Sequence, residues 1–141
     1  MRLIDSSTGM ELVRVNKVGQ DIKRVISAKL QNKSHTEYFI NTVKLPEHTL
    51  YISELDLNRE NGTIEYPVQP TIRFAIPVYN ELNQLYSLLI INVSATELIN
   101  NLQAISNSKN IEFSLLDQDD HIIEHVNEAF RFTKDLAPNI T

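Results

Sequence analysis

Residues 70–78, with the sequence PTIRFAIPV, decide the fold class. One face of this stretch is apolar and is formed by Ile72, Phe74, Ile76 and Val78. The other face carries Thr71, Arg73 and Ala75, and such an alternation is typical of a β-strand. A short polar turn leads to LYSLLIINV at residues 85–93, which is apolar on both faces. We therefore expect an antiparallel pair whose second strand is central and covered on both sides.

Strand and turn signals continue outward from this pair. Residues 2–5 and 11–16 are expected to form two strands around a turn in which Gly9 adopts a positive φ. Residues 50–57 alternate like a strand, and the dipeptide at residues 61–62, Asn-Gly, is a strong hairpin signal. The chain is therefore predicted to be rich in antiparallel strands.

Three helices are expected where a capping residue precedes apolar side chains at helical spacing. Asp21 is placed to cap a helix over residues 22–30, and the capping-box spacing of residues 34–37 predicts a short helix over residues 38–43. A second capping box at residues 94–97 opens a third helix. The face of this helix that is expected to be buried carries Leu98, Ile99, Leu102 and Ile105.

Composition narrows the classes of function. The 141 residues are 42% hydrophobic and 22% charged, which is typical of a folded soluble domain. The net charge is −5 and there is no basic cluster, so nucleic acid is not an expected partner. The absence of cysteine excludes disulfides and thiolate metal sites. No apolar run reaches the ~18 residues of a membrane span, so any membrane contact is expected through segments outside this sequence.

Two long motifs carry a resemblance to a known family. The first is YISELDLNRENG at residues 51–62, followed by PTIRFAIPV at residues 70–78. The second comprises residues 30–34 running into Tyr38-Phe39, and residues 88–93. Together they resemble the Cache sensor domains, also called PDC or PAS-like periplasmic sensors, of bacterial histidine kinases, diguanylate cyclases and chemoreceptors.

The resemblance implies an α+β fold with a PAS-like five-stranded antiparallel sheet flanked by helices. Residues 1–105 would form the sensor domain, without the long N-terminal helix with which the family usually begins. Residues 106–141 would form a C-terminal hairpin and tail, the truncated start of a membrane-proximal module in a double Cache receptor. This chain would then be the distal module.

The resemblance also implies a function. The expected role is an extracytoplasmic small-molecule sensor of an inner-membrane receptor, which signals to a cytoplasmic kinase or GGDEF-type output. The expected ligand is a small polar molecule, such as a carboxylate or an amino acid. No cofactor is expected, this part of the receptor is not expected to be an enzyme, and the full receptor is expected to be a homodimer.

Arg73 is the leading candidate for ligand contact, because a guanidinium on the polar face of an apolar strand can grip a carboxylate through two hydrogen bonds. An equally open alternative is a structural arginine, paired for example with Glu54. Tyr51 and Ser53 share a strand face, and with Tyr38 they could supply hydroxyls. Lys33 could add a cation. The alternative for these residues is a core-finishing or solvated role.

Two competing functions stay open. One is a ligand-independent dimerisation or structural module. The other, less favoured, is a zinc-dependent hydrolase, because residues 121–125, HIIEH, match a zinc-peptidase pattern. That chemistry requires a helix, whereas this segment follows the Asp-rich turn at residues 117–120 and alternates like the second strand of a hairpin. A calcium loop starting at Asp117 lacks the glycine and oxygen ligand that it needs, so a solvated turn is expected.

Overall fold

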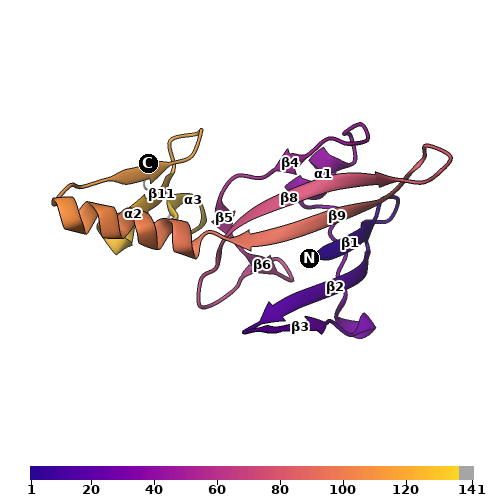
Figure 1. The fold of residues 1–141 in the computed structure, drawn as a ribbon, viewed down its shortest axis with the longest axis horizontal. Coiled ribbons are helices and arrows are strands. Elements are labelled where there is room, and N and C mark those ends of the chain that lie inside the picture. Colours follow the sequence, from indigo (N-terminus) through magenta and orange to yellow (C-terminus); the bar gives the residue numbers. More distant parts are fainter. Residues whose placement is uncertain (137–141) are drawn as a thin grey trace. The chain divides into compact units, whose positions relative to one another are not determined.

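The computed structural model describes residues 1–136 and confirms an α+β fold with a mainly antiparallel sheet (Figure 1). The main sheet has seven strands, in the order β3-β2-β1-β9-β8-β4, and β5 also pairs with β8. The sheet therefore has more strands than the five that were expected. Two of the seven strands, β4 and β5, are only two residues long.

The chain divides into two compact units. Unit 1 contains residues 1–53 and 73–92, and unit 2 contains residues 54–72 and 93–141. The predicted boundary between residues 105 and 106 falls inside unit 2. The interpretation of residues 106–141 as the start of another module stays a prediction, and residues 137–141 lie outside the described part.

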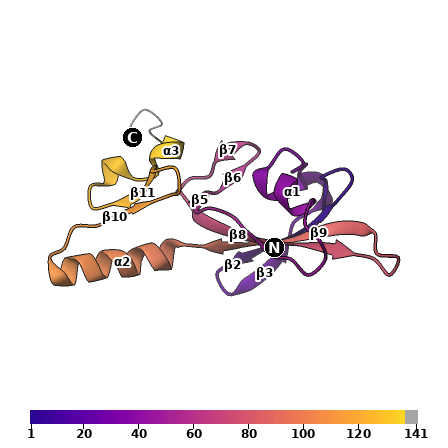
Figure 2. The same cartoon turned by 90° about the horizontal axis from the view of Figure 1, so that it is seen from above.

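Unit 1 is built on most of the main sheet and one short helix. Its elements are β1 (Arg2–Asp5), β2 (Glu11–Val18), β3 (Asp21–Arg24), a 3₁₀ turn (Ser27–Lys29), α1 (Glu37–Thr42), β4 (Tyr51–Ile52) and most of β8 (Pro70–Tyr79) and β9 (Leu85–Ser94). Helix α1 covers one face of the sheet (Figure 2). The buried cluster on that face contains Ile4, Tyr38, Phe39, Ala75, Leu88 and Ile90.

Burial on the two central strands differs from the expectation. On β8 the more buried side carries Arg73 and Ala75, whereas Ile76 on the apolar side is 37% exposed. On β9, Leu88 and Ile90 are fully buried but Ile91 is 44% exposed. The prediction that β9 is covered on both faces is therefore wrong, because α1 packs only on the face that holds Leu88 and Ile90.

The prediction of a helix after Asp21 is also wrong. Asp21–Arg24 is instead the strand β3, which pairs with the end of β2 in the register Val18↔Asp21. Gly19 has a φ of +65° and makes the tight turn between them possible. Ile22, one of the apolar residues whose spacing suggested a helix, is 76% exposed and does not pack against a core.

The expected strand over residues 50–57 is interrupted for two backbone reasons. Ser53 uses its side-chain Oγ, in place of its carbonyl, to accept the Arg73 N–H at 2.9 Å. Arg73 and Ala75 direct their backbone groups toward β4, so Pro77 faces the same edge, where it has no N–H to donate. Strand β4 is therefore limited to Tyr51–Ile52, and β5 (Asp56–Leu57) forms separately in unit 2.

Helix α1 forms where it was expected, but without the capping box. Its N-cap is Thr36, whose side chain makes no capping hydrogen bond and instead donates to the Lys33 carbonyl at 2.7 Å. The helix buries Tyr38, Phe39 and Thr42. Packing of this apolar face, rather than capping, therefore holds α1 on the sheet.

The turn between β1 and β2 is organised by one carboxylate. Asp5 Oδ1 accepts hydrogen bonds from the backbone N–H and the hydroxyl of both Ser7 and Thr8, at 2.7 to 3.1 Å. Gly9 follows with a φ of +72°, as expected, and a Cβ at this position would lie 2.5 Å from the Ser34 Cβ. The loop that carries Lys33 therefore needs glycine here.

Unit 2 contains the remaining elements around its own core. They are β5, β6 (Arg59–Glu60), β7 (Thr63–Ile64), α2 (Thr96–Lys109), β10 (Ser114–Leu116), β11 (Ile122–His125), a 3₁₀ turn (Glu128–Phe130) and α3 (Thr133–Leu136). The core consists of Leu57, Ile99, Ile123 and Phe132. Both predicted hairpins, at Asn61-Gly62 and after residue 111, are confirmed.

Only part of the expected buried face of α2 is buried. Ile99 is 6% exposed, but Leu98 and Ile105 are 49% and 54% exposed. The N-cap is Ala95, which makes no side-chain capping bond, so the capping box expected at residues 94–97 is wrong as well. The buried positions of α2, Ile99 and Ser106, are two turns apart. The part of the helix surface that is buried is therefore narrower than the apolar face that the sequence pattern indicated.

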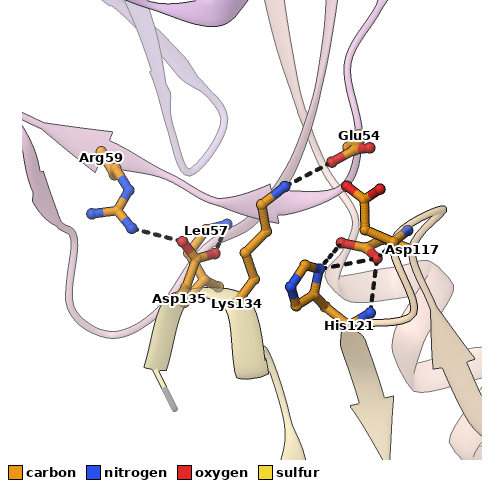
Figure 3. Close-up of polar contacts among 8 residues, drawn as sticks. Glu54, Leu57, Arg59, Asp117, His121, Lys134 and Asp135 are labelled. Atoms are coloured by element: carbon orange, nitrogen blue, oxygen red, sulfur yellow. Dashed lines mark hydrogen bonds and ion pairs between the residues drawn. The ribbon is translucent and has the colours of Figure 1, made fainter. Parts of the chain in front are cut away.

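Ion pairs connect distant segments within unit 2 (Figure 3). Asp135 on α3 accepts from the Leu57 N–H at 3.2 Å and from Arg59 at 2.6 Å. Lys134 donates to Glu54 at 3.0 Å. A separate set of contacts in unit 2 holds Glu124, which is 1% exposed. Its Oε1 atom lies 2.6 Å from Arg131 Nε and accepts a hydrogen bond from Gln103 Nε2 at 3.0 Å.

We expect the Asp5 turn to be sensitive to acid. Hydrogen bonds from Ser7 and Thr8 lower the pKa of Asp5 to about 2. A carboxyl whose pKa is lowered by folding stabilises the fold above its ordinary pKa and loses that contribution as the pH falls toward 2. A carboxyl-carbon NMR titration should give a midpoint near 2. The Asp5→Asn variant should remove this acid-dependent step in stability, and a midpoint near 4 would contradict the account.

We also expect Arg131 to matter far more than its exposed partner. Arg131→Ala would leave the buried Glu124 carboxylate without its cation and should destabilise the fold by about 3–5 kcal/mol. Glu128 also pairs with Arg131, but its side chain is 82% exposed, so Glu128→Ala should cost about 0–1 kcal/mol. Urea unfolding of both variants measures the difference. Equal losses would show that the buried pair carries no special weight.

Candidate ligand-binding site

All five residues predicted to contact a ligand lie in unit 1. Arg73 is on β8, Tyr51 is on β4 and Ser53 follows it, Tyr38 is on α1, and Lys33 is in the loop before α1. Arg73, Tyr38 and Lys33 are buried, whereas Tyr51 and Ser53 are half-buried. The structure thus places the five on β4 and directly after it, on β8, on α1 and on the loop before α1.

Arg73, Tyr38 and Ser53 are brought together directly. The Arg73 guanidinium carbon lies 5.7 Å from the centroid of the Tyr38 ring, which is a cation–π distance. The Arg73 backbone N–H donates to Ser53 Oγ, and the Ser53 N–H donates back to the Arg73 carbonyl at 2.9 Å. Tyr51 lies opposite Ala75 and packs on the cluster that contains Tyr38. Glu54, the structural partner considered for Arg73, accepts a hydrogen bond from Lys134 at 3.0 Å, and this contact leaves a pairing of Glu54 with Arg73 a prediction.

Three charged residues of this face were missed by sequence reasoning: Arg2, Glu11 and Arg14 are all buried. Arg2 Nη1 donates to Glu11 Oε1 at 2.8 Å, and Arg14 Nη1 lies 3.6 Å from Glu11 Oε2. One signal was available, because Arg2 has the same strand parity as the core residue Ile4. The shared parity was not taken as a sign of burial, because charged residues in short strands are usually exposed to solvent.

Glu11 also connects these strands to the loop of Lys33. Its Oε2 accepts the Gln31 N–H at 3.0 Å, and the Gln31 side-chain oxygen accepts from Lys33 Nζ at 2.6 Å. The Lys33 N–H donates to the Gly9 carbonyl at 2.7 Å. Lys33 is therefore held by the same network as Arg2 and Arg14.

The electrostatics at Tyr38 reflect this arrangement. Burial raises the pKa of Tyr38, and the positive charges of Arg2 and Arg73 act in the opposite direction. The hydroxyl therefore stays protonated at neutral pH and can donate to an anion. One turn further along α1, the buried Thr42 Oγ1 has no hydrogen-bond partner among the described residues. Cations, a phenol and a buried hydroxyl on one side suit a small anionic or polar molecule.

A groove of about 430 Å³ lies at another place in unit 1 and is lined by Glu47, His48, Leu50, Ile76, Pro77, Val78 and Tyr79. None of the five predicted residues lines it. Most of its lining residues are apolar, and it lies between the part of β8 around Pro77 and the residues that precede β4. Its chemistry therefore does not match the charged cluster under α1.

The segment considered for zinc is a strand and not a helix. Ile122–His125 forms β11, His121 Nδ1 lies 3.0 Å from Asp117 Oδ2, and the His125 ring stacks edge-on with Phe130. Although burial opposes it, hydrogen bonds from the His121 and Asp119 N–H groups lower the pKa of Asp117. Asp117 thus caps its own turn. Within residues 1–136 no three His, Asp or Glu side chains gather closely enough to hold a metal ion.

Comparisons with known proteins find solved structures that share this fold. Among the solved structures that resemble it are a domain of a protein assigned to the sensory box/GGDEF family from Vibrio parahaemolyticus, and the extracellular domain of vpHK1S-Z8, a protein named as a histidine kinase. The first has a TM-score of 0.73 and 21% identity over 99% of this chain and 56% of its own. The second has a TM-score of 0.68 and 22% identity over 99% of this chain and 53% of its own. This chain thus spans about half the length of either.

No curated protein matches the sequence significantly. Within the described residues, no helix is long and apolar enough to cross a membrane. The sequence does match the family model described as the sensor domain of bacterial histidine kinases, over residues 1–136. The match covers nearly the whole chain, and the chain therefore belongs to the family of bacterial histidine kinase sensor domains.

Proposed function

We propose that this chain is an extracytoplasmic Cache-type sensing domain that binds a small anionic or zwitterionic molecule under α1. The observation that carries the proposal is the buried guanidinium of Arg73, stacked on Tyr38 and bound through its backbone to Ser53. A buried cation strongly favours a nearby negative group, because the low dielectric there strengthens their attraction.

The residues around Arg73 give the proposed ligand a polar end and an apolar contact. The guanidinium can form two parallel hydrogen bonds with a carboxylate, and the Tyr38 hydroxyl can donate a third. Tyr51 and Ala75 supply apolar surface beside them. Lys33 adds a second cation from the neighbouring loop. Amino acids and small carboxylates have this combination of groups.

The location and the output of the receptor are part of the same proposal. One of the similar solved structures is an extracellular domain, which supports a place outside the inner membrane. Both similar chains are about twice as long, which supports a double Cache arrangement in which this chain is the distal module and residues 106 onward begin the proximal one. The full receptor would be a homodimer that signals to a cytoplasmic kinase or GGDEF-type domain. Ligand binding would shift the balance between two dimer arrangements.

A second candidate is a ligand-independent dimerisation module. The sheet face away from α1 exposes apolar side chains, including Ile52 at 56%, Ile76 at 37% and Ile91 at 44%. An exposed apolar face of this kind marks an interaction surface. The absence of any ligand in a broad screen, together with self-association of the chain, would favour this candidate.

The test is a thermal-shift screen with amino acids, mono- and dicarboxylates, short fatty acids and sugars. A ligand at about 100 times its Kd should add about 2.7 kcal/mol of stability. This shift should disappear in Arg73→Ala, and Arg73→Lys should weaken it because lysine lacks the planar fork. Arg24→Ala, an exposed cation on β3, is the matched control and should keep the full shift. A hit that survives in Arg73→Ala would remove Arg73 from the site.

A further inference from the structure

The groove of about 430 Å³ in unit 1 lies where the pairing of β4 with β8 stops. The register of this pair places Tyr51 opposite Ala75. Continued by two residues, the same antiparallel register would place Thr49 opposite Pro77. The pairing does not continue, because β4 begins at Tyr51. The residues that line the groove come from both sides of this gap, with 47, 48 and 50 on one side and 76–79 on the other.

Two backbone features keep the gap open. Pro77 has no N–H and cannot donate a hydrogen bond across the gap to the Thr49 position. His48 has a φ of +64°, a left-handed conformation that an extended strand does not contain. The chain therefore turns at residues 47–48 instead of pairing with β8. Both segments carry the cause of the groove in their own sequence.

The gap is closed at both of its ends. At one end Tyr51 pairs with Ala75, and at the other the Tyr79 hydroxyl donates to the Leu45 carbonyl at 3.0 Å. The stretch of β8 from Ala75 to Tyr79 spans about 13 Å at the rise of a strand. A groove of this length, closed at both ends, suits a small molecule with one ring and a short chain better than an added strand.

Most of the lining offers apolar surface to such a molecule. Leu50 and Ile76 lie on opposite sides of the gap and are 51% and 37% exposed. Pro77, Val78 and Tyr79 complete this part of the lining. Covering exposed apolar side chains with an apolar group removes both surfaces from water and favours binding. The groove therefore favours a ligand with an apolar body.

The charge of the lining is negative. With histidine neutral, Glu47 is the one lining residue that carries a formal charge. Its Oε1 lies 3.8 Å from His48 Nε2, which is beyond the length of a hydrogen bond, and the two side chains are 48% and 88% exposed. The carboxylate therefore keeps acceptor positions for a ligand cation. The net charge of the chain, −5, adds to the attraction.

We propose that this groove is a second ligand site, which takes a small molecule with an apolar body and a cationic amine. The apolar body lies on Leu50 and Ile76, and the amine donates to the Glu47 carboxylate. No residue of the groove belongs to the site under α1, so the inference goes beyond the proposed function and does not rest on it. The two sites select opposite charges.

The experiment uses three probes that share a benzene ring and a two-carbon chain. They are 2-phenylethylamine as the cation, 2-phenylethanol as the neutral molecule and 3-phenylpropionate as the anion. Each is titrated into the whole chain at neutral pH and constant ionic strength, and amide NMR shifts are followed. Shifts should be largest at residues 47–50 and 76–79. The Kd should be millimolar for probes of this size, and the amine should bind about two- to fivefold more tightly than the alcohol, as for an exposed ion pair.

Glu47→Gln removes the charge and keeps the size of the side chain. The advantage of the amine over the alcohol should fall to about one, while the Kd of the alcohol changes by less than about twofold. Because Glu47 is exposed, the fold should survive this substitution. Glu37→Gln changes an exposed glutamate of α1 outside the groove and is the matched control, which should keep the preference for the amine.

Three results would overturn the inference. The absence of saturable shifts at the groove residues with 2-phenylethylamine would remove the site. Equal affinity for the amine and the alcohol, or a preference for the amine that persists in Glu47→Gln, would remove the assigned charge selection. Shifts centred on Arg73 and Tyr38 would place the probe under α1 instead. The proposed function is decided separately, by the screen with Arg73→Ala, so its failure is distinguishable from each of these results.

Discussion

A guanidinium group removed from water must keep hydrogen-bonding partners, and this constraint organises unit 1. Arg2 and Arg14 share the buried Glu11 carboxylate, whose second oxygen also binds the Gln31 backbone. Through Gln31 the network reaches Lys33 and the loop that leads into α1. Helix α1 then places Tyr38 over Arg73. The candidate site is thus a consequence of the way in which the sheet satisfies its buried cations.

Sequence patterns predicted the elements that are set by local chemistry. The strands at residues 2–5 and 70–78 and the Asn61-Gly62 hairpin formed because alternation and turn propensity agree there with the tertiary structure. The failures have tertiary causes. The segment after Asp21 forms a strand because β2 continues to Val18 and offers an edge for pairing. The strand after Leu50 breaks because Ser53 and Pro77 alter the backbone hydrogen bonds between β4 and β8.

The site was predictable only in part for a similar reason. Arg73 stood out because it interrupts an apolar strand, and strand parity together with side-chain chemistry suggested Tyr51 and Ser53, with Tyr38 and Lys33 as further candidates. Burial of Arg2 depends on Glu11, nine residues away along the chain, and on a sheet register that strand alternation does not specify. Likewise, the contact between Glu54 and Lys134 joins residues eighty positions apart. Pairs of this kind appear only when the chain is folded.

The central claim is that small anions or zwitterions bind beside Arg73 and Tyr38 under α1. The most direct measurement is an NMR titration, with the best-stabilising small molecule, that follows arginine Nε–Hε and tyrosine ring signals. The account predicts that the Arg73 and Tyr38 signals shift together with one common, saturable affinity. Shifts confined to the ring of Tyr79, which lines the other groove, or to exposed cations such as Arg24, would contradict it.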